Sequence, residues 1–487
     1  MFKASDRLIH LRVRVQIVFR RLVFASVLFF GLHGAALGTE TADHPSPPTT
    51  EASTLTPHPG YLLLTEKAYL PPDFDQETFD SVWKVWPQPL REQAADVSVE
   101  ERRQMAFQRY GLTKRPGDDS GKPLQYVVDD QGHWTMNCLA CHGGSVYGRP
   151  TPGAPNNLYA LQTLSEEIRK TKLRMGKTLT RMDLGSLAIP LGTTHGTTNA
   201  VVFGVALMNF RDRHLNIVNA PPPPVVHHDM DAPPWWYFHK RPYLYIDGFA
   251  QRGHRGLMQF ILVQENGPEK FRQWEQDFRQ IYDYLMSLRP PPYEGPIDHG
   301  LADRGQALFR VNCAECHGGN GGRDSVERYP NHREPLDSIG TDPVRLRAIP
   351  LEGRQRYAES WFAAAGEDPE SVQHTILDPD GYVAPPLDGI WASAPYFHNG
   401  SVPTLWHVLN PEQRPTVWRR IAEEIDAEKV GLRIEVVHQI PLTESDFAVR
   451  RQYFDTRKAG KSNAGHDYPD SLTPSEKQAV LEYLKTL

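Results

Sequence analysis

The sequence contains little sulfur and no strong excess of either charge. Only four of its 487 residues are cysteine and nine are methionine, and no methionine follows Met286. The 53 lysines and arginines nearly balance the 59 aspartates and glutamates, which gives a formal net charge of −6. Such a chain lacks the broad positive field that nucleic-acid binding requires, so we expect no nucleic-acid partner. After residue 38 no segment has about 18 uninterrupted apolar residues, so no membrane-spanning helix is predicted there.

All four cysteines fall in two Cys-x-x-Cys-His pentapeptides. These are Cys138, Cys141 and His142 in the first motif, and Cys313, Cys316 and His317 in the second. Histidine makes up 20 of 487 residues, so finding it after both cysteine pairs by chance has odds of roughly one in 600. The pattern is the attachment signature of c-type haem, in which two thiols add to the porphyrin vinyl groups and the histidine binds the iron. Two motifs predict two covalently attached haem c groups.

Two other uses of the cysteines are weaker. A four-thiolate zinc site would leave both following histidines unexplained and would close a loop of about 175 residues. Disulfide bonds between the cysteines would likewise leave the Cys-x-x-Cys-His spacing unexplained. Both alternatives therefore rank below haem attachment.

The first 38 residues have the pattern of an export signal. A basic stretch with Arg12, Arg14, Arg20 and Arg21 precedes an apolar run over residues 22–32, and small residues follow. The basic stretch is long for a signal peptide, so an uncleaved membrane anchor is the alternative. Residues 39–60, rich in Thr, Pro and Ser, are expected to form a flexible lead-in. The chain is therefore predicted to be periplasmic or extracellular, with a possible N-terminal membrane tether.

The rest of the chain predicts a mainly α fold with two cytochrome c-like haem domains, long irregular loops and an N-terminal extension. We place an N-terminal haem domain with its cap at residues 61–290 and a C-terminal cytochrome c domain at 295–487. The proline-rich run 290–296 separates them. Capping-box spacing predicts helices over 98–110 and 474–484, and apolar spacing predicts one over 301–311. The terminal helix should pack on the helix at 301–311.

The second haem domain has no methionine, so its sixth iron ligand must come from another residue type. His466 lies in a loop just before the terminal helix, the position that usually supplies the distal ligand in small c-type domains, and we favour it. His398 is the rival, although a hydrogen bond to loop backbone or to a haem propionate is the better interpretation of this residue. The other downstream histidines are expected to be surface or packing residues: His332, His374, His407 and His438.

The first haem domain offers many candidates for a distal ligand and none that stands out. They are His195, His227, His228, His254, Met208, Met230 and Met258. For each one taken separately, a packing or surface role is the better interpretation. This pattern permits an open sixth position, which an oxygen- or peroxide-activating haem requires.

With these motifs the chain resembles the dihaem cytochrome c peroxidase superfamily, and within it the rubber-oxygenase-like dihaem c-type cytochromes. The matching segments are residues 138–144, 196–200, 232–236, 247–249, 312–318, 385–392, 394–405 and 463–466. The resemblance implies that the N-terminal haem is the active site and that a bis-His C-terminal haem relays electrons. It also implies that Phe249 is a distal phenylalanine and that Trp235 or Trp236 lies between the haems. Rubber oxygenases are considerably longer, so the resemblance carries architecture and redox division but not polymer cleavage.

Two main functions follow as hypotheses. The first is an exported oxidoreductase whose N-terminal haem activates dioxygen or peroxide, served by a small redox protein or a quinone-linked electron donor or acceptor. The second is a non-enzymatic electron carrier in which both irons are six-coordinate. A structural or sensor role is a third and weaker hypothesis. The substrate could be an unsaturated hydrocarbon, peroxide itself or another protein.

Overall fold

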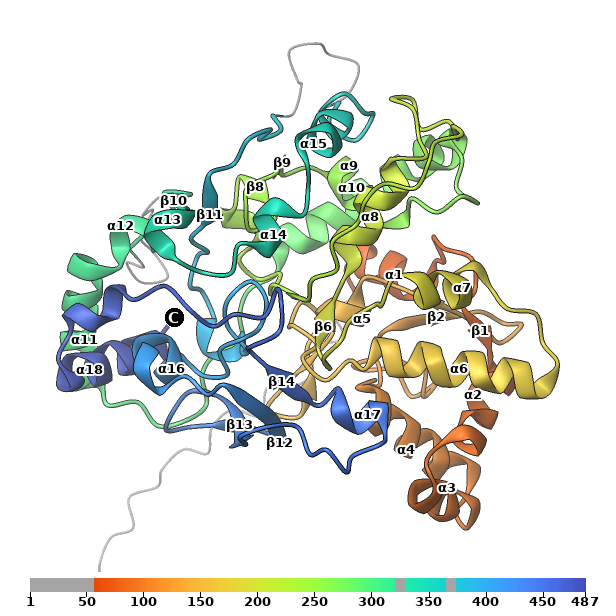
Figure 1. Cartoon of the computed structure of the whole chain (residues 1–487), viewed down its shortest axis with the longest axis horizontal. Coiled ribbons are helices and arrows are strands. Elements are labelled where there is room, and N and C mark those ends of the chain that lie inside the picture. The colour runs from red at the N-terminus through yellow and green to blue at the C-terminus, as the bar shows by residue number, and fades with distance from the viewer. Residues whose placement is uncertain (1–56, 320–328, 365–373) are drawn as a thin grey trace, which may run out of the picture. The chain divides into compact units, whose positions relative to one another are not determined.

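The computed structural model describes residues 57–319, 329–364 and 374–487 (Figure 1). The predicted export signal at 1–38 and nearly all of the predicted lead-in at 39–60 lie outside these residues. Within the described part of the chain, no helix combines the length and the apolar character needed to cross a bilayer. The described chain is mainly helical, with eighteen α-helices and mostly short strands.

The N-terminal cap is built from small helices around one antiparallel sheet. The helices are α1 (Pro59–Glu66), α2 (Gln76–Ser81), η1 (Val82–Val85), α3 (Gln88–Ala95) and α4 (Val99–Tyr110). The sheet has the order β1-β3-β2, from Phe74–Asp75, His133–Met136 and Tyr126–Val128. Ser98 caps α4 and exchanges hydrogen bonds with Glu101, so the predicted capping box is confirmed.

The segment from the first motif to residue 290 is helical with many short two-residue strands. Its helices are α5 (Leu139–His142), α6 (Leu161–Met175), α7 (Arg181–Ala188), α8 (Ala200–Met208), η2 (Phe238–Lys240), α9 (His254–Met258), η3 (Gln259–Ile261) and α10 (Pro268–Ser287). Its strands pair as β4 (Ser145–Val146) with β5 (Arg149–Pro150), β6 (Thr197–Thr198) with β7 (Met230–Asp231), and β8 (Tyr243–Leu244) with β9 (Ala250–Gln251). The amphipathic α10 packs on α1 and α9.

The remainder carries the second motif. Its helices are α11 (His299–Asn312), α12 (Ala314–His317), α13 (Leu336–Ile339), α14 (Val344–Arg347), α15 (Leu351–Ala358), η5 (Ile390–Ala392), α16 (Leu405–Leu409), η6 (Pro411–Gln413), α17 (Phe447–Arg450), η7 (Tyr468–Ser471) and α18 (Pro474–Leu484). The strands β10 (Arg333–Pro335) and β11 (Gly381–Val383) form a ribbon. The sequence did not lead us to expect a further sheet of order β13-β12-β14, from Gly431–Val436, Val417–Asp426 and Tyr453–Asp455.

Helices α11 and α18 pack side by side, as predicted (Figure 1). Gly305 of α11 faces the Ala479 carbonyl of α18 so closely that a Cβ atom would overlap it. Phe309 and Tyr483 then meet with ring centroids 5.3 Å apart. The cap of α18 is the predicted capping box, formed by Thr473 and Glu476 with Pro474 at the first helical position.

The apolar core does not follow the predicted boundary at 290–296 strictly. Tyr357 and Phe362, which follow the boundary, belong to the same buried cluster as Phe249 and Phe271. Helix α15 accordingly packs on α8 (Figure 1). The division into two haem domains stays a prediction, but part of the second half of the chain completes the core of the first.

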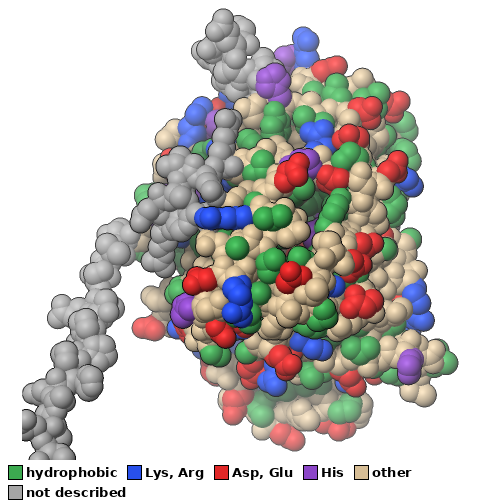
Figure 2. Space-filling model, turned by 90° about the vertical axis from the view of Figure 1, so that its left-hand side faces the viewer, with side chains coloured by type: hydrophobic (Ala, Val, Ile, Leu, Met, Phe, Trp, Pro, Cys, Tyr) green, Lys and Arg blue, Asp and Glu red, His purple; other side chains and the backbone are tan. Residues whose placement is uncertain are grey.

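The side of the molecule on the left in Figure 1 carries charges of both signs. Figure 2 shows acidic and basic side chains interspersed over this face, without a large area of one sign. This matches the near balance of charges in the sequence.

Candidate haem-binding site

Two backbone and ring contacts hold the first motif histidine. His142 ends the short helix α5, and its Nδ1 donates to the carbonyl of Pro233 over 2.9 Å. Trp235 stacks on the imidazole, with centroids 4.5 Å apart and an interplanar angle of 22°. A donor at Nδ1 leaves the Nε2 lone pair free to bind a metal, which is how ligating histidines are commonly oriented.

The second motif repeats this arrangement. His317 ends α12, and its Nδ1 donates to the carbonyl of Pro385 over 2.9 Å. Burial lowers the pKa of His142 to about 4 and also lowers the pKa of His317. Both imidazoles are therefore neutral near pH 7, the form that binds a metal.

Both acceptor carbonyls belong to the first proline of an Ala-Pro-Pro tripeptide, at 232–234 and at 384–386. A proline segment has few internal hydrogen bonds, so its carbonyls are free to accept from a side chain. Nothing in the sequence singled out these prolines for this role. The repeat is a weak signal alone, because Ala-Pro-Pro also occurs at 220–222.

The two motifs open into one cavity of about 870 Å³. It is lined by all four cysteines, both motif histidines and mainly apolar side chains from both halves of the chain. This volume lies toward the upper end of the range for cofactor pockets, about 300–1,000 Å³. No disulfide joins the cysteines. Among the described residues the four thiols do not gather at one point, as a zinc site would require. The residues present thus fit haem c attachment.

His466 faces the second motif histidine. The ring centroids of His317 and His466 lie 6.2 Å apart with the planes at 67°. Two imidazoles that bind one metal ion from opposite sides through Nε2, each at about 2 Å, have centroids about 6 Å apart. The backbone of His466 has a φ of 56° and its N–H donates to Ile339 over 2.7 Å. Burial lowers the pKa of His466 to about 3, so this ring is also neutral.

A buried arginine fixes the loop that carries His466. Arg414 donates through Nη1 to the carbonyls of Asn463 and Gly465, at 2.8 and 2.7 Å, and through Nε to that of His407 at 2.9 Å. Its guanidinium also lies over the ring of Phe397 at 4.9 Å. Arg414 therefore positions the loop, although no motif or spacing in the sequence pointed to it.

His398 lines the same cavity in a different setting. Its ring packs on Tyr382 with centroids 4.5 Å apart, and its backbone carbonyl accepts from the N–H of Asp231. Burial lowers the pKa of His398 to about 3. The structure brings His466, rather than His398, into ring contact with His317; the iron ligand itself stays a prediction.

The predicted aromatic residues separate into three environments. Trp235 lines the cavity beside His142. Trp236 belongs to a second buried cluster, which contains Phe309 and Tyr483, and its Nε1 donates to the Asp388 carbonyl over 2.7 Å. Phe249 is buried behind the cavity wall, against Tyr357 at 4.9 Å. The described cavity lining includes Tyr245 and not Phe249, so the distal role implied for Phe249 has no support from its position.

Of the seven candidates for a distal ligand in the first domain, the described cavity lining includes Met230 alone. His227 is paired with Asp229 at 3.2 Å, and His254 with Glu275 at 3.0 Å. Elsewhere in the cavity lining, Tyr245 donates from its hydroxyl to Gln259 over 3.0 Å. Within the described residues, the ring stacked on His142 is that of Trp235, and no second imidazole is in ring contact with it.

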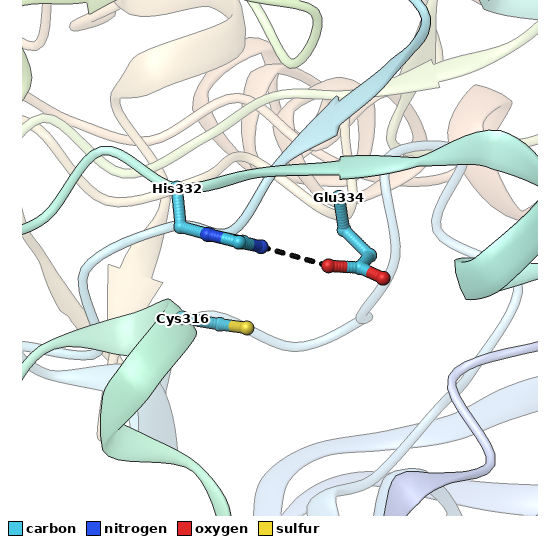
Figure 3. A group of neighbouring side chains, drawn as sticks. All are labelled: Cys316, His332 and Glu334. Atoms are coloured by element: carbon cyan, nitrogen blue, oxygen red, sulfur yellow. Dashed lines mark hydrogen bonds and ion pairs between the residues drawn. The ribbon is translucent and has the colours of Figure 1, made fainter.

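Three side chains beside the second motif could be mistaken for a separate metal site. Figure 3 shows Cys316 of α12 beneath His332 and Glu334, which come from the β10 segment. His332 and Glu334 are already paired at 2.7 Å, and Glu334 also accepts from Tyr468. Thioether formation at the second motif would use the Cys316 sulfur. The group therefore belongs to the surroundings of the haem site.

Two protein families match the second half of the chain. A cbb3-type cytochrome c oxidase subunit III family matches residues 300–363, which contain the second motif. A family described as RoxA-like, cytochrome c-like matches residues 381–419, which contain Pro385, His398 and Arg414. These matches support a relationship between the second half of the chain and a cytochrome c family related to the RoxA-like cytochromes. The cytochrome c domains imply haem c as the cofactor and haem-based electron transfer or oxidoreductase chemistry.

The cytochrome is also similar to two proteins of Sinorhizobium fredii (strain NBRC 101917 / NGR234). Uncharacterized protein y4iM is 32% identical over 245 residues, a match that covers 42% of this chain and 53% of that protein. Uncharacterized protein y4iJ is 31% identical over 263 residues, covering 42% of each chain. The match thus spans about half of these relatives.

Proposed function

We propose that this cytochrome is an exported dihaem oxidoreductase with one reactive and one relaying haem. The observation that carries the proposal is an asymmetry: His317 faces the imidazole of His466 at 6.2 Å, whereas His142 has an indole stacked on it and no second imidazole in ring contact among the described residues. An iron held by two histidines has no vacant position. The haem held by His142 can keep one.

The chain's own residues would divide the work as follows. Cys138 and Cys141 hold the first haem, and Pro233 orients His142 through Nδ1. The apolar wall near Tyr245 and Gln259 limits the access of water. When bound, haem iron supplies one-electron exchange and the activation of dioxygen or peroxide.

On the second side, Cys313 and Cys316 would hold the haem, and His317 and His466 would bind its iron. Pro385 and Arg414 keep these two rings in place. A small redox protein or a quinone-linked carrier outside the cytoplasmic membrane would exchange electrons there. The substrate is an unsaturated hydrocarbon, peroxide or another protein.

A pure electron carrier is the second candidate, and one observation favours it. Met230 lines the cavity, and it pairs across β6 and β7 with Thr198. Thr198 contacts Cys141, so Met230 lies near the first motif. A thioether from Met230 would give the first iron a sixth ligand.

Two measurements test the proposal. A haem stain and haem quantitation on the denatured protein should give two haems per chain, falling to one in Cys138→Ala/Cys141→Ala and to one in Cys313→Ala/Cys316→Ala. Carbon monoxide added to the reduced protein should then bind one equivalent per chain. Uptake of none, restored to one in Met230→Ala, would identify the electron carrier. The absence of any haem stain would remove both functions.

A further inference from the structure

Arg241 is a buried cation without an acidic partner in the described part of the chain. It is 7% exposed, and it lines the cavity shared by the two motifs. Its Nη2 donates to the backbone carbonyl of Tyr245, and its Nε has no hydrogen-bond partner. A guanidinium stays charged, and leaving it buried and unpaired is costly. The position therefore calls for an anion.

Among the residues that the structure describes, no side chain around Arg241 supplies that anion. The cavity lining also contains Asp231, but this carboxyl forms no ion pair with Arg241, and burial raises its pKa well above the ordinary range. The phenols of Tyr237 and Tyr329 are near enough to sense the charge of Arg241, but burial raises the pKa of each, to about 12 for Tyr329. Asp388 is taken by Lys240 at 2.6 Å.

The position of Arg241 indicates where its partner comes from. The neighbouring Tyr237 belongs to one core cluster and Phe238 to the other, so Arg241 lies between the cores that surround the two motifs. Tyr329 donates to the carbonyl of Ala384, next to the Pro385 that orients His317. A porphyrin attached at either motif would bring its propionate carboxylates into the cavity that Arg241 lines.

We propose that Arg241 forms an ion pair with a haem propionate inside the cavity. This inference rests on the proposed attachment of haem. The pair would satisfy the free Nε–H and would neutralise a carboxylate that otherwise has no cation in the apolar cavity. It would also keep a positive charge close to one iron, which favours the reduced state.

The test is a pair of variants followed by redox titration of each haem in mildly alkaline buffer. Arg241→Gln should lower the reduction potential of one haem by at least about 59 mV. For a one-electron couple this is a tenfold shift of the equilibrium toward the oxidised haem. Arg241→Lys should recover most of that shift because it keeps the charge. Arg252→Gln removes a nearby cation that does not line the described cavity, and it should change neither potential.

Infrared difference spectra of protein with ¹³C-labelled haem propionates identify the anion. In Arg241→Gln near neutral pH, a labelled C=O band of a protonated carboxyl should appear, because desolvation then favours the acid. Unchanged potentials together with an unchanged labelled band would overturn the inference. An unlabelled band would assign the partner to a protein carboxyl such as Asp231, which also overturns it. Haem stays attached through thioethers in each variant, so loss of the haem stain would count against the proposed function instead.

Discussion

In the candidate haem-binding site, the important side chains are held mainly by hydrogen bonds to backbone carbonyls. His142 and His317 each donate to a proline carbonyl, and Arg414 donates to two carbonyls in the loop of His466 and to those of His407 and Val408. Carbonyl acceptors fix the orientation of a donor without adding a negative charge to an apolar cavity. The imidazoles consequently stay neutral and oriented.

Replacing His466 with alanine tests the ligand of the second haem. The variant should lose the low-spin signal of that haem in electron paramagnetic resonance, because the iron is left with His317 alone. Added imidazole should restore the signal. His398→Ala is the matched control and should leave the signal as it is. If the low-spin signal survives in His466→Ala and vanishes in His398→Ala, the two assignments must be exchanged.

A histidine away from the haem site gives the protein a defined sensitivity to acid. His407 is 4% exposed, and its ring forms a hydrogen bond with the hydroxyl of Thr404. Burial lowers the pKa of His407 to about 4, and the positive charges of Lys429 and Arg414 also lower it, whereas Asp426 raises it. In the unfolded chain the pKa of His407 has its ordinary value of about 6.5, so on acidification the unfolded state binds a proton before the folded state does. The stability of the fold therefore falls as the pH drops from 6.5 towards 4.

Between pH 7 and pH 5, the free energy of unfolding of His407→Gln should fall by about 1–2 kcal/mol less than that of the wild type. Urea unfolding at the two pH values measures the difference. His374→Gln, at an exposed position, is the control and should follow the wild type. An unchanged pH slope in His407→Gln would contradict the assignment.

At the scale of elements, the loop before α18 depends on a residue far from it in sequence. Arg414 follows η6, and the carbonyls that it binds at Asn463 and Gly465 lie about 50 residues later. Glycine at 465 is required because its φ is 80° and a Cβ would overlap the backbone near Ile339.

Arg414→Gln should therefore release the His466 loop while leaving the haem attached. We expect a mixture of low-spin and high-spin signals at the second haem and at least tenfold tighter binding of added imidazole to its iron. Titration with imidazole, followed by visible absorption, measures the effect. Arg457→Gln removes a largely exposed arginine paired with Asp455 and should not change imidazole affinity. Equal affinities in both variants would show that Arg414 has no positioning role.

At the scale of the whole molecule, one buried carboxylate joins the two halves of the chain. Asp247 is fully buried and binds Arg345 at 3.1 Å and Arg354 at 2.8 Å, both from beyond the predicted boundary. Burial alone would raise the pKa of Asp247, but the two arginines outweigh it and leave the pKa lowered. The stability from this group is present above the ordinary aspartate pKa and is lost as the pH falls through the lower folded value.

Asp247→Asn should destabilise the protein by about 3–5 kcal/mol, because it leaves two buried arginines without a carboxylate. Guanidinium unfolding followed by haem absorbance measures the loss, and hydrogen exchange should rise first in α14 and α15. Glu435→Gln breaks an ion pair with Arg419 that is partly exposed to solvent, and it should have little effect. Similar midpoints for both variants would mean that Asp247 does not join the halves.

The sequence alone determined the features that depend on neighbours along the chain. The two Cys-x-x-Cys-His motifs predict haem attachment from five residues each, and the capping boxes at Ser98 and Thr473 specify where helices begin. The absence of methionine after Met286 also restricts the second iron to other ligands, whatever the path of the chain around it. Local chemistry needs no knowledge of the fold.

Only the tertiary structure decided which distant residues meet. It placed His466 opposite His317, put Trp235 and Trp236 in different cores, buried Phe249 behind the cavity wall and revealed Arg414 and Arg241. It also formed the β13-β12-β14 sheet, whose register depends on pairing between separate strands. Contacts of this kind depend on how the chain closes long loops, and the spacing of residues along the sequence carries little information about that closure.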